Sequence, residues 1–166
     1  MPSLDQLLAD LTSGEELMAE SAAVQFAALG ETAFTALNLL AKDANSDHRW
    51  WALRALSEFD EPDVSPLFLQ ALSEPNHEIQ ACAALGLRRH PNPLAIPALI
   101  ALLGHPEQLL SRLAGDALIA HGSQATQALI KLIESPKAHS QRARLDATRA
   151  LAEIQDPAAI STLFKV

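Results

Sequence analysis

Several residue types are scarce in this sequence of 166 residues, and each scarcity excludes a class of protein. Cys82 is the only cysteine, so no intrachain disulfide can form, and we expect a cytoplasmic location. No apolar run approaches the ~18 residues of a membrane span, and the first residues lack the basic and apolar regions of a signal peptide. We therefore expect no membrane partner.

Basic residues are also few. Twelve Lys and Arg stand against twenty Asp and Glu, which gives a net charge of −8 without any long basic run. Because a phosphate backbone is bound chiefly by Lys and Arg, we expect no nucleic-acid partner. The sequence has no glycine-rich phosphate loop, no paired cysteines and no nucleophile elbow. We therefore expect no catalysis and no cofactor.

What the sequence does contain is a repeat. The apolar helical run 79–87 is followed by a Pro/Asn turn and a second run, 95–103. The pattern returns about 31 residues later as 110–118 and 125–133, and such a fixed period is typical of a solenoid. A composition that is 49% hydrophobic and rich in Ala and Leu favours helices with a real core.

Aligned repeats share columns of small and apolar residues. In the second helix of each pair, small residues and the leucines beside them are expected to be buried. These residues are Ala52, Ala83, Ala114 and Ala147, then Ala55, Gly86, Ala117 and Ala150, then Leu56, Leu87, Leu118 and Leu151. The first helices have two such columns, Ala33, Val64, Ala95, Ala125 and Ala159, and Leu37, Phe68, Leu99, Leu129 and Leu163.

These columns predict one domain, residues 1–166, with an all-α fold. We expect a right-handed α-α superhelix, a solenoid of about five helix pairs. Residues 1–30 are expected to form an N-terminal cap pair, residues 31–157 the regular repeats, and residues 158–166 a C-terminal helix. This last helix, containing Leu163 and Val166, is either a cap or the start of a truncated pair.

Two segments carry a family resemblance, Arg49-Trp-Trp-Ala-Leu-Arg-Ala-Leu56 and Arg144-Leu-Asp-Ala-Thr-Arg-Ala-Leu151. They resemble HEAT repeats, most of all the short, ~30-residue phycobilisome-lyase HEAT-like repeats. That family includes interaction scaffolds and subunits of enzymes that attach or detach bilin chromophores. The sequence departs from it at Gln80 and Ser111, where Arg is usual, and at His48, where a branched apolar residue is usual. DNA-alkylation-repair glycosylases are a more distant resemblance, but their expected basic concave face contrasts with this acidic chain.

The resemblance implies which residues face the concave surface. Among them we predict a partner-binding set, Trp50, Trp51, Arg54, Arg112, Asp116 and Arg149. Trp and Arg are the residue types most enriched at binding hot spots. In an alternative interpretation one Trp belongs to the core, because successive helical residues point ~100° apart and both cannot face the same way. Asp116 and Asp146 are spaced for salt bridges with Arg112 and Arg149.

The histidines and the cysteine suggest no metal site. His90 and His121 occupy equivalent helix ends, yet no third ligand stands at a credible spacing, and zinc usually takes three or four. The remaining histidines considered are predicted to be too far apart for one ion: His48, His77, His105 and His139. We interpret Cys82 as a buried packing residue, with a bilin-attaching thiol as the alternative.

The sequence thus predicts a non-catalytic scaffold or adaptor that binds another protein through its concave face. The alternative, a bilin lyase subunit or a chromophore-handling chaperone, follows from the resemblance. A bound bilin would then pair its propionates with Arg54 or Arg112 and stack on a Trp.

Overall fold

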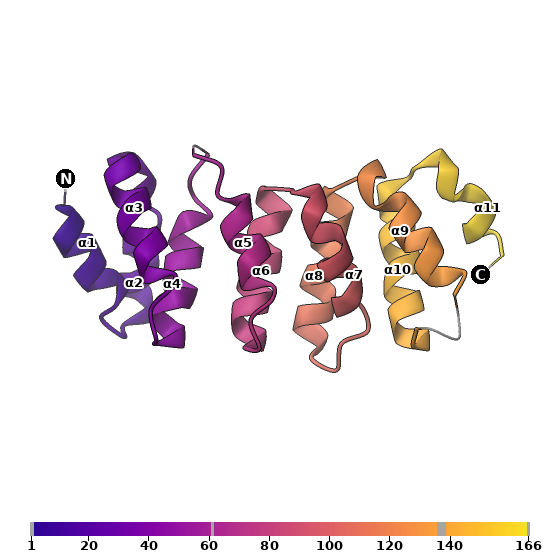
Figure 1. Cartoon of the computed structure of the whole chain (residues 1–166), viewed down its shortest axis with the longest axis horizontal. Helices are drawn as coiled ribbons and strands as arrows, with labels where there is room; N and C mark the ends of the chain where they lie inside the picture. The colour runs from indigo at the N-terminus through magenta and orange to yellow at the C-terminus, as the bar shows by residue number, and fades with distance from the viewer. Residues whose placement is uncertain (1, 61, 136–138, 166) are drawn as a thin grey trace. The chain divides into compact units, whose positions relative to one another are not determined.

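The computed structural model describes residues 2–60, 62–135 and 139–165, and the secondary structure of these residues is entirely helical (Figure 1). The chain divides into two compact units, Met1–Phe68 and Leu69–Val166. Among the described residues, no helix is both long and apolar enough to cross a membrane. The predicted division into one cap pair, regular repeats and a C-terminal helix within a single domain stays a prediction.

The first unit is a stack of short helices. Helix α1 packs against α2, α3 packs against α4, and α2 also packs against α4. Their bounds are α1 (Leu4–Leu11), α2 (Glu16–Ala23), the 3₁₀ helix η1 (Phe26–Leu29), α3 (Glu31–Leu40) and α4 (Ser46–Leu56). Helix α5 (Ser65–Ala71) begins in this unit and ends in the second.

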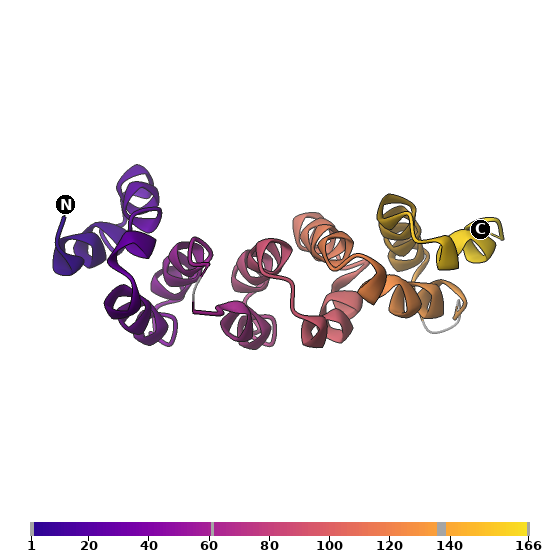
Figure 2. The same ribbon diagram turned by 90° about the horizontal axis from the view of Figure 1, so that it is seen from above.

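The second unit repeats one arrangement. Helices α6, α8 and α10 pack side by side in one row, and α7 and α9 pack in the other (Figure 2). The bounds are α6 (His77–Arg89), η2 (Pro93–Ala95), α7 (Ile96–Leu102), α8 (Gln108–Ala120), α9 (Ser123–Ile133), α10 (Gln141–Ile154), η3 (Pro157–Ala159) and α11 (Ile160–Leu163). The predicted all-α solenoid of helix pairs is confirmed.

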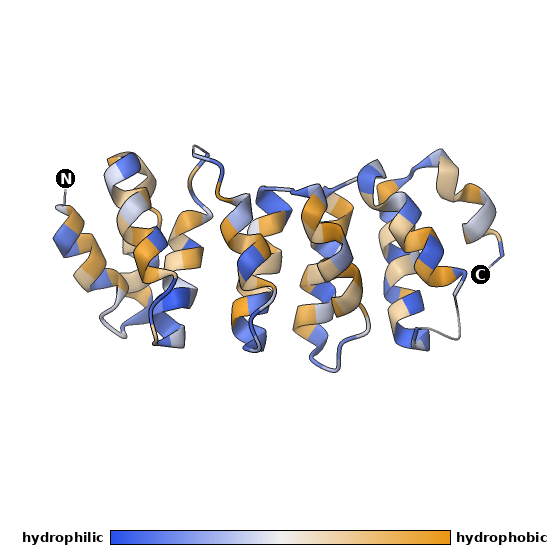
Figure 3. Ribbon diagram, viewed as in Figure 1, coloured by the Kyte–Doolittle hydropathy of each residue, from blue (hydrophilic) through white to orange (hydrophobic). Residues whose placement is uncertain are grey.

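The core follows the predicted columns. Every small residue and leucine of the three second-helix columns is buried, and so are all residues of the first-helix columns except Leu163, which is half-buried. Figure 3 shows the alternation of apolar and polar residues along the helices and the polar character of the loops. Val166, also expected to pack at the C-terminal end, lies outside the described residues. Because small residues occupy the contact between helices, the backbones can approach closely.

Short polar side chains begin many of these helices. Asn45, Asn76 and Ser140 precede α4, α6 and α10, and the side-chain oxygen of each accepts a hydrogen bond from a backbone N–H two or three residues later. Such caps satisfy donors that a helix start leaves unpaired. The same device precedes α5, η2 and η3, at Asp63, Asn92 and Asp156.

Candidate functional site

In the first unit, Trp50 and Trp51 of α4 form an aromatic pair. Their ring centroids are 4.8 Å apart and their planes meet at 83°, an edge-to-face arrangement. Both side chains are half-buried. The two rings therefore contact each other although successive helical residues point ~100° apart, and neither is fully buried.

Arg54, also on α4, is bound within the first unit. Its guanidinium donates to Glu20 of α2 and, over 2.6 Å, to Glu58 one turn further along the chain. Burial lowers the pKa of Arg54, but hydrogen bonds and charges from the two glutamates outweigh this and raise it above its ordinary value. Arg54 thus ties α2 to α4, and a partner would have to compete with two internal carboxylates for it.

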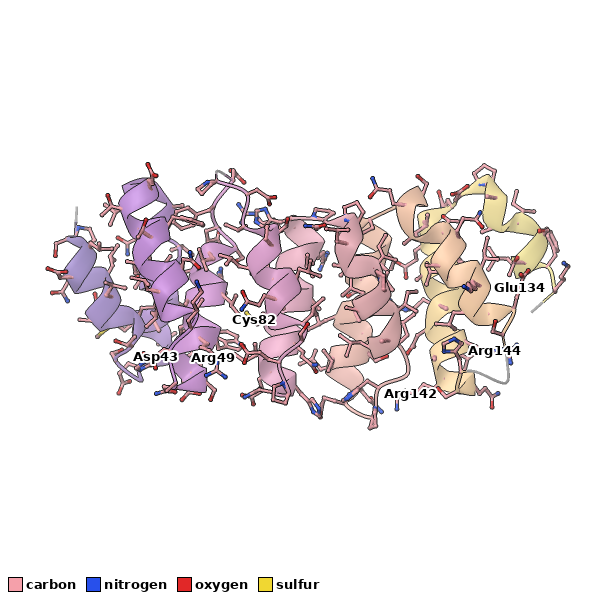
Figure 4. The ribbon with its side chains drawn as sticks, in the orientation of Figure 1. Asp43, Arg49, Cys82, Glu134, Arg142 and Arg144 are labelled. Carbon is pink, nitrogen blue, oxygen red and sulfur yellow. The ribbon has the colours of Figure 1, made fainter. Side chains whose placement is uncertain are left out.

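Three residues at equivalent positions of the second helices, Arg49, Gln80 and Ser111, bind the loop that precedes their own helix. The Arg49 Nη1 donates to the carbonyl oxygens of Asp43 (2.9 Å) and Ala44 (3.1 Å), near the lower end of the unit as drawn in Figure 4. Gln80 Nε2 donates to the Leu72 carbonyl over 3.1 Å. Gln80 and Ser111, which stand where Arg is usual in the family, therefore still bind the preceding loop.

Ser111, the shortest of these three side chains, has a second partner on the next pair. Its Oγ accepts from the Gly104 N–H (2.8 Å) and donates to Asp146 Oδ2 (2.6 Å). The same Gly104 N–H also donates to Asp146 Oδ2 over 3.1 Å. Ser111 is 2% exposed, so these hydrogen bonds form a buried link between α8 and α10. The salt bridge expected for Asp146 is replaced by bonds to neutral donors.

Arg149 of α10 makes a salt bridge with Asp116 of α8, a pairing between two helices that the spacing of residues along the sequence did not specify. Its Nη1 lies 3.2 Å from Asp116 Oδ1 on α8 and 3.5 Å from Glu153 Oε1 on its own helix. A Cβ at Gly115 would lie 2.7 Å from Arg149 Nη2. Because Gly115 has no side chain, the guanidinium of Arg149 can pack against the backbone of α8.

Arg112 behaves differently. It is exposed and forms no hydrogen bond or ion pair with any residue that the structure describes, so the predicted pairing with a carboxylate is wrong for this arginine. Arg142, in the first turn of α10, is likewise exposed and without such a partner in the described part of the chain. Figure 4 places Arg142 at the lower end of α10.

These arginines surround a pocket of about 480 Å³ between α8 and α10. This volume falls within the range of ligand-binding clefts. The pocket is lined by Gln108, Leu109, Ser111, Arg112, Arg142, Asp146 and Arg149. Three lining residues are cationic and one is anionic, so the pocket differs from the acidic chain as a whole.

Three leucines of the second helices are exposed, and one of them, Leu109, lines the pocket. Leu109 and Leu145 are 59% and 60% exposed, and Leu85 of α6 is 44% exposed. In the aligned repeats, Leu85 is equivalent to Asp116 and Leu145 is equivalent to Arg112. Because positions 112 and 116 are four residues apart, both leucines lie on the same face of their helices. Apolar side chains next to unpaired arginines are a composition typical of protein-binding surfaces.

The histidines have structural partners. His121, 5% exposed, bonds the Ala117 carbonyl through Nδ1 (2.7 Å), and its Nε2 lies 3.1 Å from the Asn92 N and 2.9 Å from the Asn92 O. The rings of His77 and His105 are 4.6 Å apart, so the expectation that these two lie far apart is wrong. Among the described residues, no three His, Cys, Asp or Glu side chains gather where they could hold a metal ion.

Cys82 is buried on α6, 6% exposed, as expected of a packing residue. Its place among the alanines of that helix leaves little thiol surface for a reaction with a large chromophore. Figure 4 shows Cys82 on the body of the helix rather than at a loop.

The sequence analysis missed Arg142, Leu109 and Gln108. A signal was present: Gln108 and Arg142 stand four residues before Arg112 and Asp146, hence on the same helical face. The predicted set also combined residues of both units. Within the second unit the structure brings Arg112 and Arg149 together around the pocket and pairs Asp116 with Arg149, and within the first it brings Trp50 and Trp51 together.

The stacked helical hairpins define an α-solenoid repeat protein. A family profile described as HEAT repeats matches residues 34–119, just over half of the 166 residues. A profile described as a PBS lyase HEAT-like repeat matches residues 143–163. The chain belongs to the HEAT-repeat family. HEAT repeats generally mediate protein–protein interactions, and their arrays are typically non-enzymatic.

Solved structures support the same fold. Two crystal structures of engineered proteins from the Northeast Structural Genomics Consortium are similar to this chain. One is 22% identical with a TM-score of 0.57, and the match covers 99% of this chain and 85% of that one. The other is 21% identical with a TM-score of 0.60, covering 99% and 87%. None of the curated proteins compared matches the chain.

Proposed function

We propose that this protein is a non-catalytic scaffold or adaptor, located in the cytoplasm, that binds another protein through the exposed face of its second helices. The observation that carries the proposal is the surface of α8 and α10. It exposes Leu109 on α8 and Leu145 on α10, and it carries Arg112, which has no partner among the described residues. Burying such leucines against a partner contributes about 25 cal/mol per Å² of apolar area. Arginine adds directional hydrogen bonds at the same place.

The tryptophan pair of the first unit is the second element of the proposal. Trp50 and Trp51 are half-buried and support each other edge to face, which limits the freedom that binding would remove. Rigid aromatic anchors of this kind are common hot spots. We expect Trp51→Ala to weaken partner binding without loss of helicity by circular dichroism. Binding that survives this change would remove the tryptophans from the site.

A cross-linking experiment tests the proposal. A photoreactive amino acid is introduced at Leu109 or Leu145, and in control proteins at Leu39 or Leu94, which are 69% and 73% exposed on other helices. In cells that make the protein naturally, we expect the first pair to capture one common protein and the control pair to miss it. The captured protein is then purified and its affinity measured by calorimetry.

The purified partner gives the decisive comparison. Leu145→Asp is expected to lower its affinity at least about tenfold, because an unpaired charge would be buried in the interface. Leu94→Asp is the matched control and should leave the affinity unchanged. Equal affinity for both variants would contradict the proposed surface.

The alternative function is that of a bilin lyase subunit or a chromophore-handling chaperone. It is favoured by the match of residues 143–163 to a PBS lyase HEAT-like repeat, which overlaps the Arg149 side of the pocket. Arg112, which has no partner among the described residues, is better placed than Arg54 to pair with a propionate, since Arg54 already binds two glutamates. Adding a bilin while recording its absorbance and the Trp fluorescence tests this alternative, and no change at high bilin concentration would exclude it.

A further inference from the structure

The pocket between α8 and α10 concentrates positive charge on an acidic protein. The chain has a net charge of −8, yet Arg112, Arg142 and Arg149 all line this one pocket. Arg112 and Arg142 come from different helices, and neither binds any residue that the structure describes. Two guanidinium groups held on rigid helices without internal carboxylates are available for external ones.

We propose that this pocket binds an acidic segment of the partner protein, with carboxylate side chains pairing with Arg112 and Arg142 and an apolar side chain between them contacting Leu109. This inference rests on the proposed interaction function and adds the chemistry of the partner. Arginine forms bidentate pairs with carboxylates, which fixes the direction of the bound segment as well as adding affinity.

The carboxylates near the pocket already have hydrogen-bond or ion-pair partners. Asp116 and Glu153 accept from Arg149, and Asp146 Oδ2 accepts from Ser111 and the Gly104 N–H. Among the described residues, no carboxylate pairs with Arg112 or Arg142. Gln108 and Leu109 of the pocket belong to the first turn of α8, and Arg142 belongs to the first turn of α10, so the helix dipoles add a small attraction for anions at that end.

The size and the apolar surroundings favour a peptide segment over a nucleic acid. Leu109 and Leu145 are among the most exposed leucines of the second unit, and a partner with charged groups alone would leave them in water. A nucleic acid gains its affinity from many phosphate contacts along a basic surface, and the acidic remainder of this chain repels it. A short segment that alternates acidic and apolar residues satisfies both parts of the site.

Fluorescence anisotropy with labelled peptides tests the inference. Three dodecapeptides are compared on the full chain: one with Asp and Glu spaced around Leu, one with Asn and Gln in their places, and one with Lys. We expect saturable binding of the acidic peptide, weakened by salt, and at least about tenfold weaker binding of the amide peptide. Equal binding of the acidic and amide peptides would overturn the inference.

Two double variants test whether the peptide binds at the pocket. Arg112→Ala with Arg142→Ala removes two positive charges from its rim, whereas Arg88→Ala with Lys131→Ala removes two from exposed positions outside it. All four side chains are exposed, so both double variants should keep wild-type urea unfolding. We expect at least about a tenfold loss of affinity in the first double variant and little change in the second. Equal losses in both would show non-specific charge attraction and overturn the site.

Two further binding experiments test competing classes of ligand. A labelled single-stranded oligonucleotide and vesicles containing anionic lipid are tested with the same variants. Tighter Arg112- and Arg142-dependent binding of either one than of the acidic peptide would replace the protein segment as the ligand. If no peptide binds while Leu145 still captures a partner by cross-linking, the acidic-segment inference fails and the interaction function stands.

Discussion

The guanidinium of Arg149 lies where a side chain at Gly115 would have to be, since a Cβ there would come within 2.7 Å of Nη2. This relationship joins two neighbouring helix pairs, because Gly115 belongs to α8 and Arg149 to α10. Gly115 is in the interior of a helix and is buried, a position where glycine lowers helix stability relative to alanine. Here it leaves room for the ion pair between Arg149 and Asp116.

Gly115→Ala is therefore expected to move Arg149 with little change in overall stability. The helix gains about 1 kcal/mol from replacing glycine, while a half-exposed ion pair contributes less than ~1 kcal/mol. Urea unfolding should show a net change within about 1 kcal/mol. The specific effect is on the energetic coupling between Asp116 and Arg149. Asp116→Asn should lower the free energy of unfolding of the wild type, but it should leave that of the Gly115→Ala variant unchanged. If Asp116→Asn also destabilised the Gly115→Ala variant, Arg149 would still pair with Asp116 there, which would contradict the prediction.

Gly104→Ala is expected to have the opposite outcome. Gly104 has φ +74, and a Cβ would lie 2.7 Å from the Ala143 backbone N, which cannot rotate away as a side-chain tip can. The strained φ alone costs about 1–3 kcal/mol for a non-glycine residue. We expect a loss of at least about 2 kcal/mol in the free energy of unfolding, measured with urea. A variant as stable as Gly115→Ala would contradict the close approach of this loop to α10.

His121→Leu tests the buried histidine. The leucine retains most of the apolar contact but loses the bonds of the ring to the Ala117 carbonyl and to the Asn92 backbone. Leaving such groups without this partner costs about 1–3 kcal/mol. Denaturant unfolding should show this loss, whereas His139→Leu, at an exposed position, should have little effect. Similar stability of both variants would mean that the His121 bonds add nothing net.

Acid should weaken the contact between Asp156 and α9. The backbone N–H of Ala158 and then the hydroxyl of Thr126 hydrogen-bond the carboxylate and lower the pKa of Asp156 below its ordinary 3.8. A lowered folded pKa gives stability that is present above about pH 3.8 and lost as the pH falls through the folded value. The stability gap between wild type and Asp156→Asn should therefore shrink in urea titrations below pH 3.8. A gap that is constant with pH would contradict this linkage.

Arg54→Met is expected to act first on the stability of the first unit. The methionine keeps an apolar stem but leaves Glu20 and Glu58 without their common cation. Because the Arg54 side chain is 20% exposed, the loss should reach about 1–3 kcal/mol in urea unfolding. Arg88→Met, at an exposed site, is the control. If Arg54→Met left stability unchanged while abolishing partner binding, Arg54 would be an interface residue after all.

Much of the fold could be predicted from the sequence because burial follows the period of the repeat. Ala83, Ala114 and Ala147 recur at the period of the repeat, in equivalent positions of successive second helices, and each is fully buried. The caps at Asn45 and Asn76 are also local, since a side-chain oxygen reaches a backbone N–H only two or three residues away. Features of this kind need no knowledge of neighbouring repeats.

The site needed the tertiary structure. The Ser111–Asp146 bond joins residues 35 apart in sequence, and the Arg149–Asp116 pair joins residues 33 apart, so both depend on the register of α8 against α10. The sequence placed Arg112 and Arg149 on one face but could not tell which would be paired, because guanidinium reach and competing carboxylates are set by packing. The repeat thus determined which residues are buried, because burial follows its period, and the tertiary contacts decided which charges of the described residues are paired.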